Sequence, residues 1–273
     1  MALDKVIDSA QLDADLTAVA DAIRTKGGTS EALSFPDGFV SAVEGIQAGG
    51  GGVNEQEIID ALAVGTFPSG DVVLNASGDF RFPNYAFFAN SGITSLTMPY
   101  CTIVRGDNVF GASSGLTKVS FPVLTEVAGK LFVNCSKLVD VSFPELVKLN
   151  KDQAIENTGI ERVVFPKVIS TYNNAMRYNK KLQYLEFGKS PSFATNVFNG
   201  CSVLSTVVIR GNTVASLSNI SAFANTPLAS GGSGGTVYVP SALIPQYQQA
   251  TNWSTLYAAG TCNFVAIEGS EYE

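Results

Sequence analysis

The residue types that most often carry chemistry are sparse in this chain of 273 residues. It contains no histidine, so the commonest general base, metal ligand and pH switch is missing, and triads of the Ser-His-Asp or Cys-His kind are excluded. Its four cysteines, Cys101, Cys135, Cys201 and Cys262, include no C-x-x-C pair, which disfavours a zinc cluster. We therefore expect no catalytic nucleophile and no metal site.

Carboxylates and glycines offer no further reactive arrangement. Glu55 and Glu57 fall on one predicted helix and Asp13 and Asp15 on another, where acidic residues typically form a solvated face or stabilise a helix N-terminus. The glycine run at 49–52 lacks the lysine and the following helix pattern of a phosphate-binding loop, and no calcium-loop pattern occurs. The sequence predicts a protein that is not an enzyme and has no cofactor.

The charge of the chain restricts its partners. The formal net charge is −7 and no basic run occurs, so a nucleic-acid partner, which needs clustered lysine and arginine, is not expected. Hydrophobic residues make up 45% of the chain, which indicates a substantial core. The opening MALDKVIDSAQLDADL lacks the apolar region of a secretory signal, and no apolar run approaches the roughly 20 residues of a membrane span. We expect neither a signal peptide nor membrane insertion.

A repeat of 22 residues organises most of the chain. The motif F-x-x-C/S/N-x-x-L-x-x-V-x-F-P stands at 110–122 and 132–144, and weaker copies start at Phe88, Ala154, Met176, Phe198 and Phe223. Its leucine position recurs at Ile93, Leu116, Leu138, Ile160, Leu182, Leu204 and Leu228. The alternation in L-x-x-V-x-F marks a short strand, which the proline ends because it cannot donate to a continuing ladder. Because one unit alone buries too little surface, the units must stack on one shared core, as in a solenoid.

A small polar or thiol side chain follows each phenylalanine position by three residues, as a buried turn needs in order to satisfy its backbone. This ladder reads Ser91, Ser113, Cys135, Asn157, Asn179, Cys201 and Thr226. Cys135 and Cys201 would lie three coils apart, roughly 14 Å at the spacing of paired strands, which is too far for a disulfide. Cys101 takes the place of Leu124 in its own repeat, so we expect Cys101 and Cys262 to be packed in the core.

These residues resemble the BspA-like leucine-rich repeats, whose units carry an A-F-x-x-C-x-x-L core, over about Phe80 to Pro240. The resemblance implies a mainly β, mixed α/β leucine-rich-repeat solenoid of about seven 22-residue coils with terminal caps, preceded by a small N-terminal helical module. The departures are Ala154 and Met176 at the phenylalanine position and Gly188 and Arg210 at the proline position. They predict less regular fifth and sixth coils on the same fold.

In the coil of this family, the residues between the inward positions of the strand face outward. Carried over to this chain, the outward ladder is Ser95, Thr97, Lys118, Ser120, Asp140, Ser142, Arg162, Val164, Tyr184, Glu186, Thr206 and Val208. We expect ligand binding on its middle part, which consists of Lys118, Ser120, Asp140, Ser142, Arg162, Tyr184 and Glu186, since broad solenoid faces commonly serve recognition. Two alternatives stay open: solvated strand residues without a ligand, or binding by the loops at 173–174, 177–178 and 229–235.

The two ends predict caps and an attachment module. Apolar residues recur at helical spacing before the glycine run, and those expected to serve assembly are Leu12, Leu16, Val19, Ile23, Phe39 and Val43. We divide the chain into a helical attachment module (1–47), a linker (48–52), an N-terminal cap (53–82), the solenoid (83–240) and a C-terminal cap (241–273). The first cap should hold a short helix at 55–63 and strands within 72–82. The second should hold a helix at 240–250 and a strand at 263–268, with Trp253 packed inside rather than serving as a ligand platform.

Two further resemblances bear on function. The segment LTAVADAIRTKGG…LSFPDGFVSAVEGI is similar to small modules on tail and baseplate proteins of phages that infect Gram-positive bacteria, with a generic helical hairpin as the alternative. The closing phrase ATNWST…FVAIEGS resembles the end of phage-encoded repeat proteins. They imply a virion protein (a tail fibre, tail tip or receptor-binding protein) that docks to tail or baseplate proteins through its N-terminus.

The same resemblances imply that the repeats contact a host glycan, teichoic acid or protein, and a homo-oligomer is among the expected assemblies. The first alternative is a bacterial leucine-rich-repeat adhesin or cell-surface interaction protein, which would need an export signal or an anchor. The second alternative is a cytoplasmic interaction scaffold.

Overall fold

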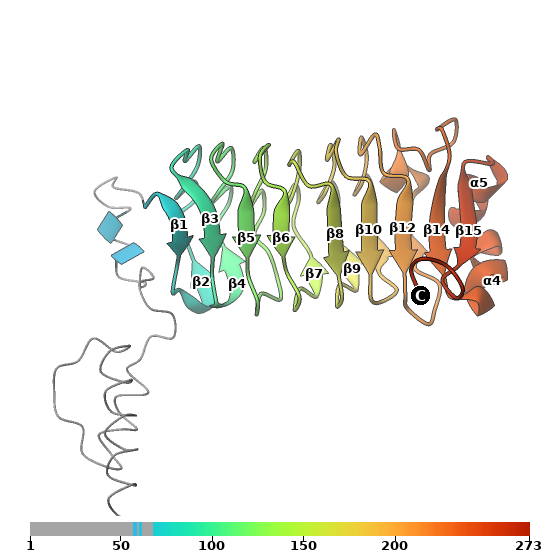
Figure 1. Ribbon diagram of the computed structural model, residues 1–273, viewed down its shortest axis with the longest axis horizontal. Helices are drawn as coiled ribbons and strands as arrows, with labels where there is room; N and C mark the ends of the chain where they lie inside the picture. Colours follow the sequence, from blue (N-terminus) through green and yellow to red (C-terminus); the bar gives the residue numbers. More distant parts are fainter. Residues whose placement is uncertain (1–56, 59, 62–67) are drawn as a thin grey trace, which may run out of the picture. The chain divides into compact units, whose positions relative to one another are not determined.

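The computed structural model describes residues 57, 58, 60, 61 and 68–273, which are drawn in colour in Figure 1. The chain divides into two units, Met1–Gly52 and Val53–Glu273, and the fold described below is that of the second. The predicted module at 1–47 and the linker at 48–52 lie outside the described residues. Of the short helix predicted over 55–63, Glu57, Ile58, Asp60 and Ala61 are helical.

Short parallel strands, one from each turn, stand side by side in an elongated row that we call the front column (Figure 1). Its first sheet consists of β1 (Gly70–Val73), β3 (Ile93–Thr97), β5 (Lys118–Ser120) and β6 (Asp140–Ser142). Its second sheet consists of β8 (Arg162–Phe165), β10 (Tyr184–Phe187), β12 (Thr206–Ile209), β14 (Gly235–Val239) and β15 (Cys262–Ala266). The predicted solenoid is confirmed, and β1 and β15 extend the seven predicted coils at the two ends.

A second set of strands lies behind the front column, and we call it the back column (Figure 1). It begins with the pair β2 (Ser77–Arg81) and β4 (Tyr100–Arg105). It continues through β7 (Lys148–Leu149), β9 (Ser170–Thr171), β11 (Ser192–Phe193) and β13 (Ser216–Leu217). Single bridges from Ile103 to Glu126 and from Glu126 to Lys148 join the two parts. Each turn of the chain is therefore a flattened coil with a front strand and a back segment.

The core fills the space between the two columns. Every residue at the predicted leucine position is buried, from Ile93 at 2% exposure to Leu228 at 0%. Phenylalanines from successive front strands also stack inside, as Phe165 and Phe187 do with ring centroids 5.7 Å apart. Burial of one such side chain contributes about 1.5–3 kcal/mol, so each coil is stabilised mainly by the neighbours on which it stacks.

The phenylalanine column is displaced by one residue from the prediction in two coils. Phe88 is 46% exposed, and Phe87 instead stacks on Phe110 with centroids 5.1 Å apart. In the fourth predicted coil Ile155 rather than Ala154 takes the position: the Phe132 amide donates to Ala154 O, just as the Phe110 amide donates to Leu131 O, the carbonyl of the residue before Phe132. The observed column is Phe87, Phe110, Phe132, Ile155, Met176, Phe198 and Phe223. The prediction assumed a constant period, whereas the chain places inward whichever neighbouring residue fits the core.

The polar ladder moves with this column, so Asn90 and Thr158 replace the exposed Ser91 and Asn157. Its members bond across coils: Ser113 Oγ donates to Phe87 O at 3.1 Å, and Cys135 Sγ donates to Phe110 O at 3.1 Å. Asn179 and Cys201 make the same bond to the carbonyls of Ile155 and Met176, at 2.7 and 3.3 Å. These four members therefore donate to a backbone carbonyl of the preceding coil, whereas Asn90 and Thr226 bond within their own coil and Thr158 donates to the Asn179 side chain.

All four cysteines are buried and free of disulfides, which confirms their predicted packing. Burial raises the pKa of the Cys101 thiol to about 11 and those of Cys135, Cys201 and Cys262 to about 12. Since the thiolate is the reactive form, these residues behave as small core side chains.

Two residues of each repeat adopt left-handed backbone, four positions apart and flanking the phenylalanine column. The first set, with φ from 51° to 63°, is Tyr85, Asn108, Lys130, Gln153, Asn174 and Asn196. The second set, with φ from 52° to 77°, is Ala89, Ala112, Asn134, Asn157, Tyr178, Gly200 and Asn225. Asparagine is the commonest residue in both sets because it tolerates this conformation better than other residues with a side chain. These positions bend the chain at the same place in every turn.

The C-terminal cap closes the last coil. The predicted helix at 240–250 comprises η2 (Ser241–Leu243) and α4 (Ile244–Gln249), and the predicted final strand is β15. The sequence did not predict α5 (Trp253–Ala258), nor the single turn η1 (Ile220–Phe223). Trp253 is 1% exposed and its Nε1 donates to Ala215 O at 2.7 Å, so it belongs to the cap as predicted. No helical segment in the part of the chain that the structure describes has the length and apolar character that crossing a bilayer requires.

Candidate recognition surface

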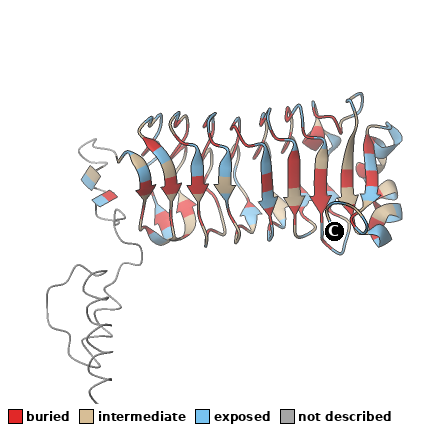
Figure 2. Ribbon diagram, viewed as in Figure 1, coloured by how far each residue is buried: buried red, intermediate tan, exposed pale blue. Residues whose placement is uncertain are grey.

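The outward face of the front column is open over its first half. Lys118, Asp140, Ser142 and Arg162 are exposed and Ser120 is half-buried, so these predicted residues lie on one accessible surface (Figure 2). The register pairs Lys118 directly with Asp140, and Lys118 Nζ lies 3.0 Å from Asp140 Oδ2. Both side chains are more than half exposed, so this ion pair adds little stability and leaves their polar groups available to a ligand.

The same face is covered over its second half by the chain itself. The segment 267–273 runs across the outward face near β12 and β14 (Figure 1). Its Tyr272 ring lies 5.4 Å from the ring of Tyr184 and 4.6 Å from that of Tyr238, and Arg210 Nη2 donates to Tyr272 O at 2.7 Å. Tyr184 is only 7% exposed and Val208 is fully buried. The prediction that Tyr184 and Val208 are exposed is therefore wrong. The repeat pattern does not extend to segment 267–273, so it could not predict that this segment covers them.

Glu186 is likewise held inside this covered region rather than exposed. Its carboxylate lies 2.6 Å from Arg210 Nε and 3.6 Å from Arg162 Nη2, and it accepts a hydrogen bond from the Tyr184 hydroxyl. Burial opposes ionisation of Glu186, but the bonds from Tyr184 and Arg210 outweigh it, so its pKa is lowered. Burial and the bond to Glu186 raise the pKa of Tyr184 to about 12. These two predicted site residues act as internal partners of the fold.

Arg162 stands at the border between the open and covered halves. Its guanidinium carbon lies 3.5 Å from the centroid of the Tyr184 ring, in cation–π geometry, while its side chain remains 57% exposed. Contact with both the ring and Glu186 fixes the orientation of the group. A ligand on the open half would therefore meet a preorganised cation at this edge.

A cavity of about 300 Å³ opens between β6 and β8, at the end of the open half that borders the covered half. It is lined by Val141, Ser142, Phe143, Pro144, Arg162, Val163, Val164 and Pro166. The predicted residues Ser142 and Arg162 stand on opposite walls of this cleft. The sequence pattern did not indicate it: the unit on the β8 side departs from the motif at Ala154, but its strand residues Val163, Phe165 and Pro166 match the motif.

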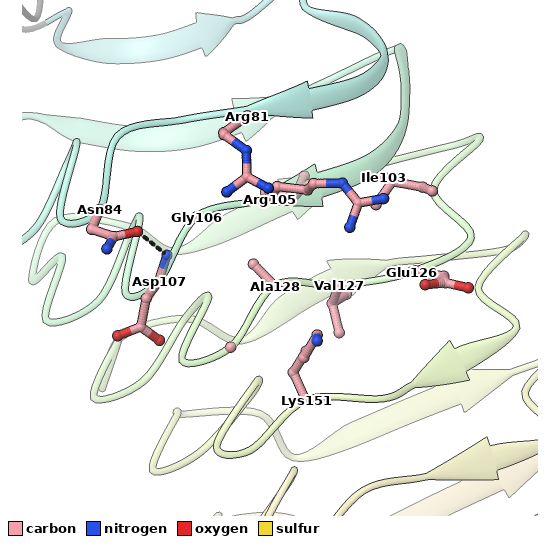
Figure 3. Close-up of a pocket in the computed structure, with 12 residues that line it drawn as sticks. Arg81, Asn84, Ile103, Arg105, Gly106, Asp107, Glu126, Val127, Ala128 and Lys151 are labelled. Carbon is pink, nitrogen blue, oxygen red and sulfur yellow. Dashed lines mark hydrogen bonds between the residues drawn. The ribbon is translucent and has the colours of Figure 1, made fainter.

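A second cavity, of about 330 Å³, lies beside the back column of the early coils (Figure 3). Arg81, Arg105 and Lys151 bring cations to it, and Arg105 is held by Asp79, whose pKa is lowered by this bond. Gly106 and Gly129 leave room at its floor. Asp107 and Glu126 line the same cavity, so it presents charges of both signs, and no sequence signal selected these residues. Within the described residues no group of three or more Cys, Asp or Glu could hold a metal ion.

The loops proposed as the alternative surface are exposed in part. Tyr178 is 41% exposed with the Arg177 guanidinium 5.1 Å from its ring centroid, and Arg177 Nε is bonded to Glu156 at 2.6 Å. The insertion at 229–235 contains Gly231 and Gly234, both with positive φ. The predicted assembly residues, Leu12, Leu16, Val19, Ile23, Phe39 and Val43, lie outside the described residues.

Comparison with protein families settles the relationship of the repeat region. The model of the BspA type leucine rich repeat region matches residues 80–183 and 167–231, in six copies, which together are more than half of the chain. The chain belongs to this family. BspA-type repeats form solenoids, and leucine-rich-repeat solenoids typically serve as non-enzymatic scaffolds for interaction with proteins or surfaces.

A comparison with solved structures finds a similar protein. It is a leucine-rich repeat protein from Bacteroides ovatus, 17% identical, with a TM-score of 0.44, over 59% of this chain. The present chain covers 47% of that protein, so it spans about half the length of the similar structure. No curated protein matches the chain.

Proposed function

We propose that this BspA-type repeat protein is a phage virion component, such as a tail fibre, tail tip or receptor-binding protein, that recognises the host surface through the open half of its front face. The observation that supports recognition by this half is the contrast between the two halves of one face, and the virion role is inferred from the resemblance of the N-terminal segment to tail and baseplate modules. Segment 267–273 covers the later strands, whereas Lys118, Asp140 and Arg162 remain accessible on the earlier ones. Broad solenoid faces are a common recognition surface, and the covering leaves only the first half for a partner.

The chemistry of this open half suits a ligand with both polar and charged groups. Lys118 and Asp140 present opposite charges side by side, Ser120 and Ser142 add hydroxyls, and Arg162 adds a fixed cation. A host glycan or a cell-surface protein offers matching groups, whereas a nucleic acid would need a wholly basic surface. The proposed partner is therefore a surface glycan or protein of the host.

Attachment to the particle is assigned to the module at 1–47, through Leu12, Leu16, Val19, Ile23, Phe39 and Val43. The support is the resemblance of this segment to modules of tail and baseplate proteins. A module of this size is marginally stable alone, so it needs a partner surface or self-association. The same open face would equally serve a bacterial adhesin, and detection of the protein in purified virions by mass spectrometry separates the two.

The recognition surface is tested by exchanging two charges. The double variant Lys118→Glu/Asp140→Lys keeps an opposite-charge pair and the net charge, but it reverses the pattern that a ligand meets. Binding of the full chain to whole bacterial cells should fall at least tenfold. Lys180→Glu, at an exposed lysine on a turn, is the control and should bind as the parent does. Equal binding by the exchanged variant would remove the open front face from the proposal.

A further inference from the structure

The front column is interrupted between β6 and β8, which do not pair with each other. β6 pairs with β5 on its other side, and β8 pairs with β10 on its other side. At the preceding step the Phe121 amide donates to Ser142 O at 3.0 Å. The equivalent bond from the Phe143 amide to Val164 O is absent from this stretch of the described chain. The facing strand edges therefore carry backbone donors and acceptors without a partner in the neighbouring coil.

The backbone amide at the start of β8 also lacks the hydrogen bond to the preceding coil that equivalent amides make. The Asp140 amide donates to Thr117 O at 3.1 Å in the coil before it, and the Tyr184 amide donates to Glu161 O at 3.3 Å. The equivalent Arg162 amide makes no such bond to the β6 coil in the described region. Unpaired backbone groups are unfavourable when they are removed from water, so such an edge favours a partner that supplies matching groups.

The interruption also uncovers the core. Val141 occupies the inward position of β6 and is partly exposed, whereas the equivalent Val119 and Val163 are 0% and 3% exposed. Figure 1 shows a wider gap between β6 and β8 than between their neighbours, and the cavity of about 300 Å³ lies there. The back column stays closed at this point, since β7 pairs with β9. The cleft is thus a wedge that opens only on the recognition face.

The chemistry of this wedge matches a peptide. Its walls are mostly apolar, which suits one aliphatic side chain, and its rims offer free amide and carbonyl groups at the spacing of a β-strand. The chain itself shows that this face accepts a peptide segment: Ile267 and Tyr272 cover Val208 and Tyr184 farther along, and Arg210 binds the Tyr272 carbonyl. No exposed aromatic ring lines the wedge, as stacking of a sugar would require.

We infer that the cleft between β6 and β8 binds an extended peptide segment of a protein partner by taking one aliphatic side chain against Val141 and Val164. The partner backbone then bonds to the free edges of β6 and β8. This inference deepens the proposed function, because it selects a protein rather than a glycan as the ligand of this part of the face.

The test uses the full chain labelled with carbon-13 at its valine methyl groups and titrated by NMR. The probe is the capped peptide acetyl-Thr-Val-Thr-Val-Thr-amide, with acetyl-Thr-Ser-Thr-Ser-Thr-amide and N-acetylglucosamine as comparisons. The valine peptide should give saturable shifts at Val141 and Val164, and the serine peptide should bind at least tenfold more weakly. Val164→Lys, on the wall, should weaken the valine peptide at least tenfold, whereas Val139→Lys, at an exposed valine outside the cleft, should not.

Three results would overturn the inference: equal binding of the serine peptide, saturable shifts at these methyl groups from N-acetylglucosamine alone, or no saturable shift from any probe. The titration needs no cells, so it is independent of the charge-exchange test. A failed titration with lost cell binding in the exchanged variant overturns the cleft and leaves the proposed function. A positive titration with unchanged cell binding of the exchanged variant supports the peptide-binding cleft and contradicts recognition of the host surface through the open front face.

Discussion

Single residues in this fold are constrained by their place in a column more than by their immediate sequence neighbours. Gln153 belongs to the first left-handed set with φ 53°, a conformation that costs an ordinary residue about 1–2 kcal/mol. Gln153→Gly removes that cost but adds chain entropy in the unfolded state, so we expect a net stabilisation of about 0.5–1 kcal/mol. Urea unfolding measures it. Gln183→Gly, at a glutamine with ordinary φ, is the matched control and should destabilise instead.

The polar ladder gives a second prediction at this scale. Cys135→Val leaves Phe110 O with only the longer bond of 3.4 Å from the Ser113 amide, which we expect to cost about 0.5–1.5 kcal/mol in the free energy of unfolding. Cys135→Ser restores a donor of the kind that Ser113 supplies one coil earlier, so its cost should be clearly smaller. If chemical denaturation gives the two variants the same stability, the cross-coil bond is not what the position requires.

At the scale of elements, the covering segment and the cap contribute differently. Trp253 closes the core, so Trp253→Ala should destabilise by about 3–5 kcal/mol. Tyr272 only covers the outward face, so Tyr272→Ala should cost less and should mainly expose Tyr184 and Val208. Hydrogen exchange should then speed up only in β10, β12 and β14, the strands that Tyr272 covers. Global acceleration in the Tyr272 variant would mean that segment 267–273 is part of the cooperative core.

The covered carboxylate makes this region sensitive to acid. The pKa of Glu186 is lowered in the folded state from its ordinary 4.5, so its contribution to stability is complete above that value. That contribution is lost as the pH falls through the folded-state pKa, because the carboxylate then takes up a proton and weakens its bonds to Arg210 and Arg162. Glu186→Gln should flatten the dependence of unfolding free energy on pH below about 4.5. An unchanged slope would assign the acid sensitivity to other carboxylates.

The sequence predicted the fold correctly at positions that have the same physical requirement in every repeat. The leucine positions, the inward strand residues and the cross-coil donors each recur, and stacking identical units turns them into columns. It failed where one coil differs from the others: at Phe87 beside Phe88, and at Ile155 beside Ala154, either neighbour satisfies the pattern and only packing decides. Contacts between residues far apart in the sequence leave no trace in the repeat pattern. The pattern therefore did not predict that Tyr272 covers Tyr184, nor that the sheet is interrupted beside Val141.

For the whole molecule, the division of the chain into Met1–Gly52 and Val53–Glu273 predicts separable roles. Because the described core residues of the repeats all lie within the second unit, we expect deletion of residues 1–47 to leave its thermal unfolding and its cell binding unchanged. Under the proposed function the same deletion should abolish incorporation into particles, as followed by mass spectrometry of virions assembled from a phage carrying the truncated gene. Truncated protein that still copurifies with virions would move the attachment surface onto the repeats. Cell binding that disappears together with incorporation would instead place recognition in the first unit, and the open front face would lose its role.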